Sequence, residues 1–351
     1  MTTEAPDNDG LLTETPPPAP VHDDYGVSDG RWLKIDWSER IRQVTVDSAL
    51  GQTPVSYVDQ GEGAPILLVH GLGGSWRNWL ENIPFLADSH RVVALDLPGF
   101  GLSPMPTEEI SMSAYGDLVL RFADAVGLSP ETFLIGHSMG GFISTEAVTS
   151  APERFSRLSL VSAAGISFAT ISGPRKSLTA AIVKGMIPVA ASRAERNLYR
   201  KRLRTASFAG VIAHPSMIGN EILWELGTYA ALRSPALFAA AFALGGYDNR
   251  PSLAEIEIPT QIVWGQQDRL VPVGAAYSYA RRIEHAELSL VDDCGHMVQL
   301  ERPARFNGEI SRFAGQPTDL STVSQDGSPR ANRPIPPNPP RSASSERRSA
   351  A

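Results

Sequence analysis

One stretch of the sequence decides the predicted fold: Phe133-Leu134-Ile135-Gly136-His137-Ser138-Met139-Gly140-Gly141. Its apolar start reads as a buried strand, which runs into a glycine-flanked serine and then into a segment of helical character. The pattern Gly-x-Ser-x-Gly, at Gly136, Ser138 and Gly140, is typical of a tight strand-to-helix turn that presents a serine hydroxyl at its apex. The glycines are needed because such a turn strains the serine backbone and crowds its neighbours. We therefore expect Ser138 to be a nucleophile at the end of a strand.

Strands and helices alternate on both sides of this turn. Alternating apolar and polar residues predict half-buried antiparallel strands near the start of the chain, and continuous apolar runs predict strands covered on both faces. The antiparallel strands are expected at 41–46 and 55–59, and the covered strands at 66–69, 92–96, 158–161, 260–264 and 288–291. Helices are expected near 76–88, 112–126, 139–150, 273–284 and 301–313. Repeated units of this kind indicate an α/β fold with a doubly wound, mainly parallel sheet.

The alternation stops between residues 166 and 250, where only helical stretches are found, at about 177–208 and 217–232. Because the strand-helix rhythm then resumes, this region is interpreted as an all-helical lid inserted into one α/β core. The core is expected to comprise residues 36–165 and 251–315. Residues 1–35 are acidic and proline-rich, and residues 316–351 are rich in Pro, Ser and Arg. Neither end can bury enough apolar surface to offset its ordering entropy, so both are predicted to be disordered.

Composition excludes some classes of function. A hydrophobic content of 42% with 20% charged residues is ordinary for a globular protein. The balance of 31 basic against 38 acidic residues gives a net charge of −7, which argues against a nucleic-acid-binding surface. Cys294 is the only cysteine, so no intrachain disulfide is possible. The start of the chain lacks signal-peptide features, and the longest apolar stretch, 234–247, is short for a bilayer span. We expect a cytoplasmic protein without stable membrane insertion.

A serine nucleophile needs a base to take its proton and a carboxylate to hold that base in the right tautomer. His296 lies just beyond the predicted strand at 288–291, and Asp268 lies just beyond the strand at 260–264. The carboxyl ends of parallel strands meet at one edge of a sheet, where ligands bind in open α/β folds. Ser138, Asp268 and His296 are therefore predicted to converge, in the chain order that this architecture uses.

An oxyanion hole is the fourth requirement, and backbone N–H groups usually supply it. The turn itself places the amide of Met139. The run His70-Gly71-Leu72-Gly73-Gly74 follows the strand at 66–69, and its glycines let the backbone curl toward a substrate carbonyl. The N–H of Leu72 is predicted as the second donor. The run has neither the Walker nor the dinucleotide spacing, which disfavours a phosphate-binding loop.

These pieces together resemble the α/β-hydrolase superfamily, in its capped esterase and lipase-like branch. The resemblance covers about residues 41–313 and rests on five motifs, at 70–74, 96–103, 136–141, 264–268 and 294–296. It implies a Ser138–His296–Asp268 triad, no metal and no organic cofactor. The candidates for lining the substrate pocket are His70, Gly71, Gly73, Trp76, His137 and Met297.

The predicted function is two-step hydrolysis of carboxylic esters of small to medium apolar molecules, with a small-molecule ester substrate as the expected partner and no prediction of the oligomeric state. The apolar stretch at 237–244 favours an apolar acyl group, or else packs the lid onto the sheet. Haloalkane dehalogenases and epoxide hydrolases of this fold use an aspartate nucleophile and are disfavoured by Ser138.

Two alternatives remain open. The carbon–carbon bond hydrolases of aromatic degradation resemble the chain in the run 138–141 and in the helical lid. They typically carry asparagine before the serine and tryptophan after the histidine, where this chain has His137 and Met297. The second alternative is a small-molecule receptor that keeps the triad but shows little turnover.

Overall fold

A single eight-stranded sheet forms the centre of the molecule, in the strand order β1-β2-β4-β3-β5-β6-β7-β8. The computed structural model describes residues 24–27, 29–166, 199–229, 234–246 and 248–318. The strands are β1 (Ile41–Ser48), β2 (Gly51–Gln60), β3 (Pro65–Val69), β4 (Arg91–Leu95), β5 (Phe133–His137), β6 (Arg157–Val161), β7 (Thr260–Gly265) and β8 (Ala286–Val291). The pairs β1–β2 and β2–β4 are antiparallel, and all other pairs are parallel. The predicted doubly wound, mainly parallel sheet is confirmed.

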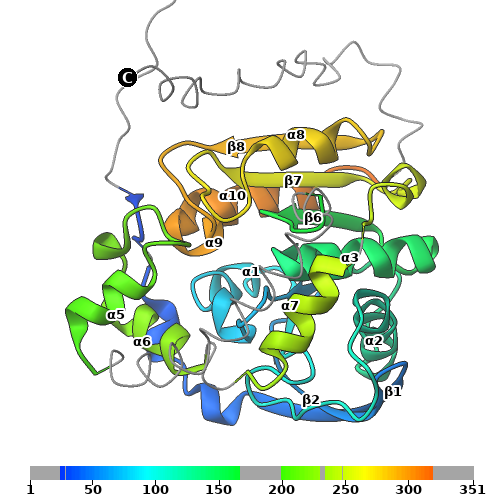
Figure 1. The fold of residues 1–351 in the computed structure, drawn as a ribbon, viewed down its shortest axis with the longest axis horizontal. Helices are drawn as coiled ribbons and strands as arrows, with labels where there is room; N and C mark the ends of the chain where they lie inside the picture. Colours follow the sequence, from blue (N-terminus) through cyan, green and yellow to red (C-terminus); the bar gives the residue numbers. More distant parts are fainter. Residues whose placement is uncertain (1–23, 28, 167–198, 230–233, 247, 319–351) are drawn as a thin grey trace, which may run out of the picture.

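Helices cover both faces of this sheet (Figure 1). They are α1 (Ile83–Leu86), α2 (Met112–Ala125), α3 (Met139–Ser150), α8 (Gly274–Ala280), α9 (Val298–Glu301) and α10 (Pro303–Ala314). Side chains of β3 alternate between two buried clusters, with Leu67 and Val69 in one and Ile66 and Leu68 in the other. The first cluster lies under α2, α3 and α8, and the second lies under α1, α9 and α10. Two covered faces are the reason that the parallel strands read as continuous apolar runs.

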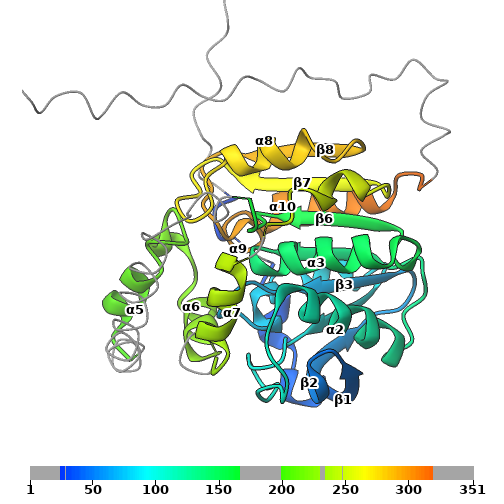
Figure 2. The same ribbon diagram turned by 45° about the vertical axis from the view of Figure 1, so that its right-hand side comes forward.

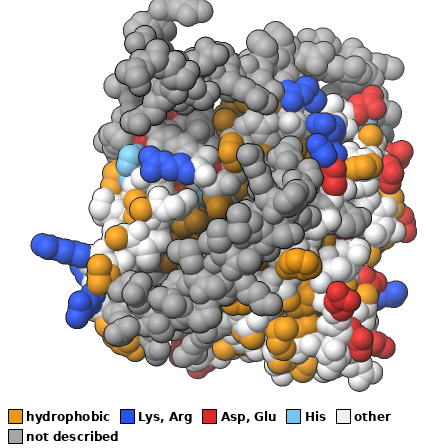
Figure 3. All heavy atoms as spheres, in the orientation of Figure 1, with side chains coloured by type: hydrophobic (Ala, Val, Ile, Leu, Met, Phe, Trp, Pro, Cys, Tyr) orange, Lys and Arg blue, Asp and Glu red, His pale blue; other side chains and the backbone are white. Residues whose placement is uncertain are grey.

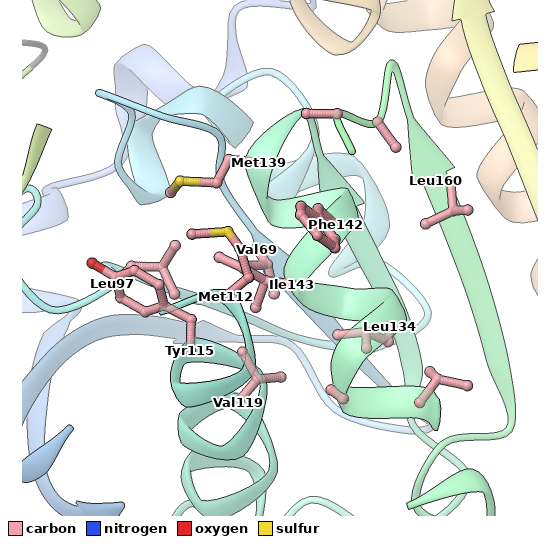
Figure 4. Packing of buried hydrophobic residues seen from close by; sticks show 14 of the residues in the cluster. Val69, Leu97, Met112, Tyr115, Val119, Leu134, Met139, Phe142, Ile143 and Leu160 are labelled. Carbon is pink, nitrogen blue, oxygen red and sulfur yellow. The ribbon is translucent and has the colours of Figure 1, made fainter. Parts of the chain in front are cut away.

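Helices α2 and α3 hold the strand that leads into Ser138. In Figure 4, Met112 of α2 lies beside Ile143 of α3 and Val69 of β3, and Tyr115 of α2 points toward Leu97. Gly116 allows α2 to lie close to α3, because a Cβ at this position would lie 2.8 Å from the side chain of Glu146. The turn at Ser138 is therefore supported by the close packing of α2 against α3.

The region predicted as one helix at 76–88 is different in the structure. It consists of a short 3-10 turn, Trp76–Trp79, and the four-residue helix α1. Pro84 has no N–H to donate to the carbonyl of Leu80, so a continuous helix would lose a hydrogen bond there. The prediction of a single helix is wrong for this reason.

The predicted disordered segment at 1–35 is also too long. Residues 24–27 and 29–35 are described, and Tyr25 and Trp32 are buried. The indole N–H of Trp32 donates to Glu81 at 2.9 Å. The composition of the segment is polar, but two large aromatic side chains are enough to attach its end to the core. The remainder of that segment, and residues 319–351, lie outside the described residues.

Every described element between β6 and β7 is helical: α5 (Lys201–Ser207), α6 (Asn220–Tyr229), α7 (Leu237–Gly246) and two 3-10 turns. These helices lie beyond the carboxyl ends of the parallel strands (Figure 2). Most of the helix predicted at 177–208 falls on residues 167–198, outside the described residues. Figure 3 shows Lys and Arg side chains projecting from the side of the molecule where α5 lies, and Lys201 and Arg202 are exposed. Among the described helices, none is long and apolar enough to cross a membrane.

Candidate active site

Ser138 occupies a strained turn between β5 and α3. Its φ of 54° and ψ of −117° fall in a region that non-glycine residues rarely adopt. A Cβ at Gly136 would lie 2.4 Å from the carbonyl oxygen of Gly140, and a Cβ at Gly140 would lie 2.3 Å from the carbonyl oxygen of Val69. Backbone therefore packs against backbone on both sides of the serine. This is the turn geometry that the Gly-x-Ser-x-Gly pattern predicts.

His296 and Asp268 form a buried hydrogen-bonded pair. Nδ1 of His296 lies 2.7 Å from Oδ2 of Asp268, and the two side chains are 3% and 0% exposed. The other carboxylate oxygen, Oδ1, accepts the amides of Leu270 at 2.9 Å and Val271 at 2.8 Å. Because the carboxylate accepts the proton on Nδ1, Nε2 of His296 is left as an acceptor. An imidazole in this tautomer can take a proton from a hydroxyl group.

The structure brings the carboxyl ends of β5, β7 and β8 together, as predicted. His137 directly precedes Ser138, and the centre of its ring lies 4.8 Å from the centre of the His296 ring. Within the described residues, no hydrogen bond joins Ser138 Oγ to His296. Such bonds are often long in ligand-free enzymes and shorten when substrate binds.

His70 and His137 are both enclosed and neutral. Nδ1–H of His70 donates to the carbonyl of Gly71 at 2.7 Å, and Nε2 accepts the amide of Leu97 at 3.0 Å. Burial lowers the pKa of His70 to about 4. Nε2–H of His137 donates to the carbonyl of His296 at 3.0 Å, and burial, followed by the neighbouring His296, lowers its pKa. Both predicted pocket residues thus bind the backbone of the loops around the site.

The loop at 70–74 lies directly against the serine. A Cβ at Gly71 would come within 2.9 Å of Ser138 Cβ, and Gly73 has a φ of +70° that a larger residue would find strained. The amide of Met139 is the first of helix α3, so it has no partner within that helix. In the part of the chain that the structure describes, neither this amide nor that of Leu72 donates a hydrogen bond. Both predicted oxyanion donors therefore lack a protein acceptor among the described residues, and their role stays a prediction.

The remaining pocket candidates lie in the interior. Trp76 is fully buried, its amide donates to Asp96 at 2.7 Å, and its ring packs on Trp37 at 5.0 Å. Met297 is 8% exposed and follows the histidine in the chain. Trp76 thus has a core position, and contact of either side chain with substrate stays a prediction.

Sequence reasoning missed two carboxylates that shape these loops. Asp96 directly follows the strand β4 and accepts the amides of Trp76 and, at 2.8 Å, Leu102. Burial raises its pKa to about 6, and these backbone hydrogen bonds oppose that shift. Glu301 is fully buried behind His296. The position of Asp96 after a strand and before a glycine-rich loop could have indicated its role from the sequence. Nothing in the sequence around Glu301 indicates its role. Among the described residues, no cluster of His, Cys, Asp and Glu could hold a metal ion.

Several proteins of known sequence or structure are similar to this chain over most of its length. The chain is 31% identical over 258 residues to the dihydrolipoyllysine-residue acetyltransferase component of an acetoin cleaving system from Pseudomonas putida. That match covers 72% of this chain but 63% of the relative, so the chain spans less than two thirds of that protein. It is also 31% identical over 280 residues to a 2-hydroxymuconate semialdehyde hydrolase from Pseudomonas sp. (strain CF600), covering 76% of this chain and 92% of the relative.

Among solved structures, a membrane phospholipase A superposes with a TM-score of 0.65 and 25% sequence identity. The superposition covers 84% of this chain and 92% of that one. Residues 66–309 match the alpha/beta hydrolase family, and this range contains the strained serine and the His–Asp pair. The chain therefore belongs to the alpha/beta hydrolase family.

Proposed function

We propose that this protein is a serine hydrolase that cleaves carboxylic esters of small to medium apolar molecules. One observation carries the proposal: the 2.7 Å hydrogen bond between His296 and Asp268 leaves Nε2 of the histidine as an acceptor, and the strained turn at Ser138 lies at the same edge of the sheet. In this proposal Ser138 is the nucleophile, His296 is the general base and acid, and Asp268 orients the imidazole. The helices between β6 and β7 form a lid over the site, and the enzyme acts in the cytoplasm.

In the acylation step, the Ser138 hydroxyl loses its proton to Nε2 of His296 while Oγ attacks the ester carbonyl carbon. The carbonyl oxygen becomes an oxyanion, which accepts hydrogen bonds from the amides of Leu72 and Met139. Collapse of this intermediate breaks the bond to the alkoxy group, which takes the proton from His296 and leaves as an alcohol. The hydrogen bond from Nδ1 to Asp268 stabilises the histidine while it is charged.

In the deacylation step, water gives a proton to His296 and its oxygen attacks the acyl carbon. The oxyanion forms again at the same two amides. When the bond to Oγ breaks, the proton returns to Ser138 and a carboxylic acid is released. No metal or redox group takes part in either step of this sequence.

The apolar surroundings of the oxyanion donors support an apolar acyl group. Met139 belongs to the same buried apolar cluster as Ala236, just before α7, and Ala240 of α7, and Leu72 packs against this cluster. An acyl chain bound at these amides would lie against this cluster. The likeness to a membrane phospholipase A, at 25% identity, supports an ester as substrate.

A carbon–carbon bond hydrolase is the second candidate. The observation that favours it is the 31% identity to 2-hydroxymuconate semialdehyde hydrolase, over 92% of that protein. The same serine, histidine and oxyanion donors would serve a vinylogous diketone. We rank it second because His137 and Met297 replace the asparagine and tryptophan that such enzymes typically carry.

The test is a p-nitrophenyl ester series of increasing acyl length, run beside a vinylogous diketone, with Ser138→Ala as the control. The proposal predicts many turnovers per site with a maximum at one acyl length, and none above background in the variant. Faster cleavage of the diketone would favour the second candidate. Binding without turnover of either substrate class would favour a receptor.

A further inference from the structure

A buried carboxylate outside the proposed triad receives four hydrogen bonds. Glu301 is 0% exposed. Its Oε1 accepts the amide of Met297 at 2.9 Å. Its Oε2 accepts the amides of Gly295 at 2.8 Å and Ala213 at 2.9 Å, and the hydroxyl of Tyr25 at 2.5 Å. The four donors come from three separate segments of the chain.

Two of these donors flank His296. Its own amide donates to the carbonyl of Val211 at 2.9 Å, so three consecutive amides, 295 to 297, are hydrogen-bonded. Gly295 is needed here, because a Cβ would lie 2.8 Å from the amide nitrogen of Ala213 and 3.0 Å from the Glu301 carboxylate. The backbone under the imidazole thus has little freedom to shift. The hydrogen bond to Asp268 orients the ring, but it does not fix this backbone.

Tyr25 brings the N-terminal segment into the same network. Its hydroxyl donates to Glu301 and accepts the amide of His214 at 2.9 Å, and the amide of Gly26 donates to the Glu301 carbonyl at 2.7 Å. The guanidinium of Arg302 lies 4.9 Å from the centre of the tyrosine ring. Burial, and then the charge of Glu301, raise the pKa of the Tyr25 hydroxyl, so it remains a donor at neutral pH. Tyr25 lies outside the residues 66–309 that match the family.

We propose that Glu301 is a positioning residue for His296, and that Tyr25 of the N-terminal segment completes its hydrogen bonding. The inference rests on the proposed function, since it assigns the histidine its base role. Glu301 does not touch the substrate. It acts by holding the peptide groups on either side of the histidine, and by connecting them to Val211 and Ala213, between α5 and α6.

The substitution Glu301→Gln tests the carboxylate with little change of shape. Glutamine has one acceptor oxygen in place of two, and its amide hydrogens would face backbone N–H donors. At least one of the amides beside His296 would then lose its partner. Because a misplacement of about 1 Å at a catalytic group can cost roughly a hundredfold in rate, we expect kcat to fall about 100-fold, with KM changed by less than about twofold.

Tyr25→Phe is the milder variant, which removes one hydroxyl donor and keeps the ring. We expect kcat to fall about fivefold at unchanged KM. The matched control is Tyr115→Phe, because the buried hydroxyl of Tyr115 donates to the carbonyl of Pro98 at 2.8 Å and takes no part in the histidine loop. Tyr115→Phe loses one buried hydrogen bond and Tyr25→Phe loses two, so the thermal midpoint should fall in both variants. Only Tyr25→Phe should lower kcat.

A readout without substrate is the low-field proton NMR signal of His296 Nδ1–H, which reports the hydrogen bond to Asp268. We expect it to shift in Glu301→Gln and, less, in Tyr25→Phe, and to stay in place in Tyr115→Phe. A folded Glu301→Gln protein with wild-type kcat and an unshifted signal would overturn the proposal. Equal losses of kcat in Tyr25→Phe and Tyr115→Phe would also overturn it. If Glu301→Gln does not fold, Tyr25→Phe decides by the same criteria.

The two proposals fail separately. If the wild-type protein hydrolyses no ester but the signal still shifts in Glu301→Gln, the proposed function is wrong and the positioning stands. If the wild-type protein hydrolyses esters and neither variant changes kcat or the signal, the function stands and the positioning is wrong.

Discussion

Ser138 and His296 both follow the carboxyl ends of strands, but their positions are fixed in different ways. Close packing of backbone against backbone fixes the position of Ser138, whereas hydrogen bonds to buried carboxylates fix the position of His296. Around Ser138, the absent Cβ atoms of Gly71, Gly136 and Gly140 let three stretches of backbone meet. Around His296, a carboxylate from α9 collects the amides that fix the loop. The comparison shows that a local glycine motif is enough to predict where backbone segments come close together. A loop held by hydrogen bonds cannot be predicted in this way, because its partners lie far away in the chain.

The largest expected effect comes from Asp268→Asn, on the histidine side. Asparagine keeps the shape, but its amide can hydrogen-bond the wrong histidine tautomer, in which Nε2 carries the proton. We expect kcat to fall by about 10³- to 10⁴-fold, by analogy with the loss recorded for a Ser–His–Asp triad. Steady-state kinetics with a p-nitrophenyl ester measure it, and a folded variant within tenfold of wild type would remove Asp268 from the mechanism.

On the serine side, Leu72→Pro deletes one oxyanion donor, because proline has no N–H. Loss of one donor typically costs about a hundred- to a thousandfold in kcat. Leu72→Ala is the control, since it keeps the amide and removes the side chain. The expected result is a large loss of kcat for proline and a small one for alanine, in the same ester assay. Equal losses would mean that the side chain matters and the amide does not.

Gly140→Ala tests the backbone crowding itself. The added Cβ would lie 2.3 Å from the carbonyl oxygen of Val69, so the turn must open or the strand must move. We expect the free energy of unfolding to fall by about 3 kcal/mol. Gly308→Ala, in α10, is the control, because its Cβ would meet nothing within 4 Å and alanine favours a helix by about 1 kcal/mol. Urea unfolding followed by tryptophan fluorescence distinguishes the two, and a neutral Gly140→Ala would contradict the crowding.

The smallest predicted effect is a pH dependence of stability on the serine side. Burial lowers the pKa of His70 to about 4, so the folded chain keeps it neutral where the unfolded chain, with a pKa near 6.5, protonates it. Its contribution to stability is therefore complete above about pH 6.5 and is lost as the pH falls toward 4. Between pH 7 and pH 5 the loss is about 2 kcal/mol.

Other buried groups titrate in this window as well. Burial raises the pKa of Asp96 to about 6, which stabilises the fold as the pH falls and opposes the effect of His70. The measurement is therefore a difference: urea unfolding at pH 7 and pH 5, for wild type and for His70→Asn. The wild-type loss should exceed that of the variant by about 2 kcal/mol. Identical losses would mean that His70 has the same pKa in the folded and the unfolded chain.

The same contrast explains what the sequence could predict. The parallel strands, the turn at Ser138 and the chain order of Asp268 and His296 follow from apolar runs and glycine positions, which are local. The break of the helix at Pro84 was also local and could have been predicted. The burial of Tyr25 and Trp32 could not, because it depends on residues far away in the chain, such as Glu81, 49 positions from Trp32, and Glu301, 276 positions from Tyr25. Glu301 reads in the sequence as an ordinary helical residue, and only the assembled fold shows its four donors.

The most direct test of the central claim is labelling with a fluorophosphonate probe, followed by identification of the modified residue by mass spectrometry. The mechanism predicts one adduct per chain, on the Oγ of Ser138, and no adduct in a folded Ser138→Ala variant. Labelling at another residue, or equal labelling of wild type and variant, would contradict the assignment of Ser138 as the nucleophile.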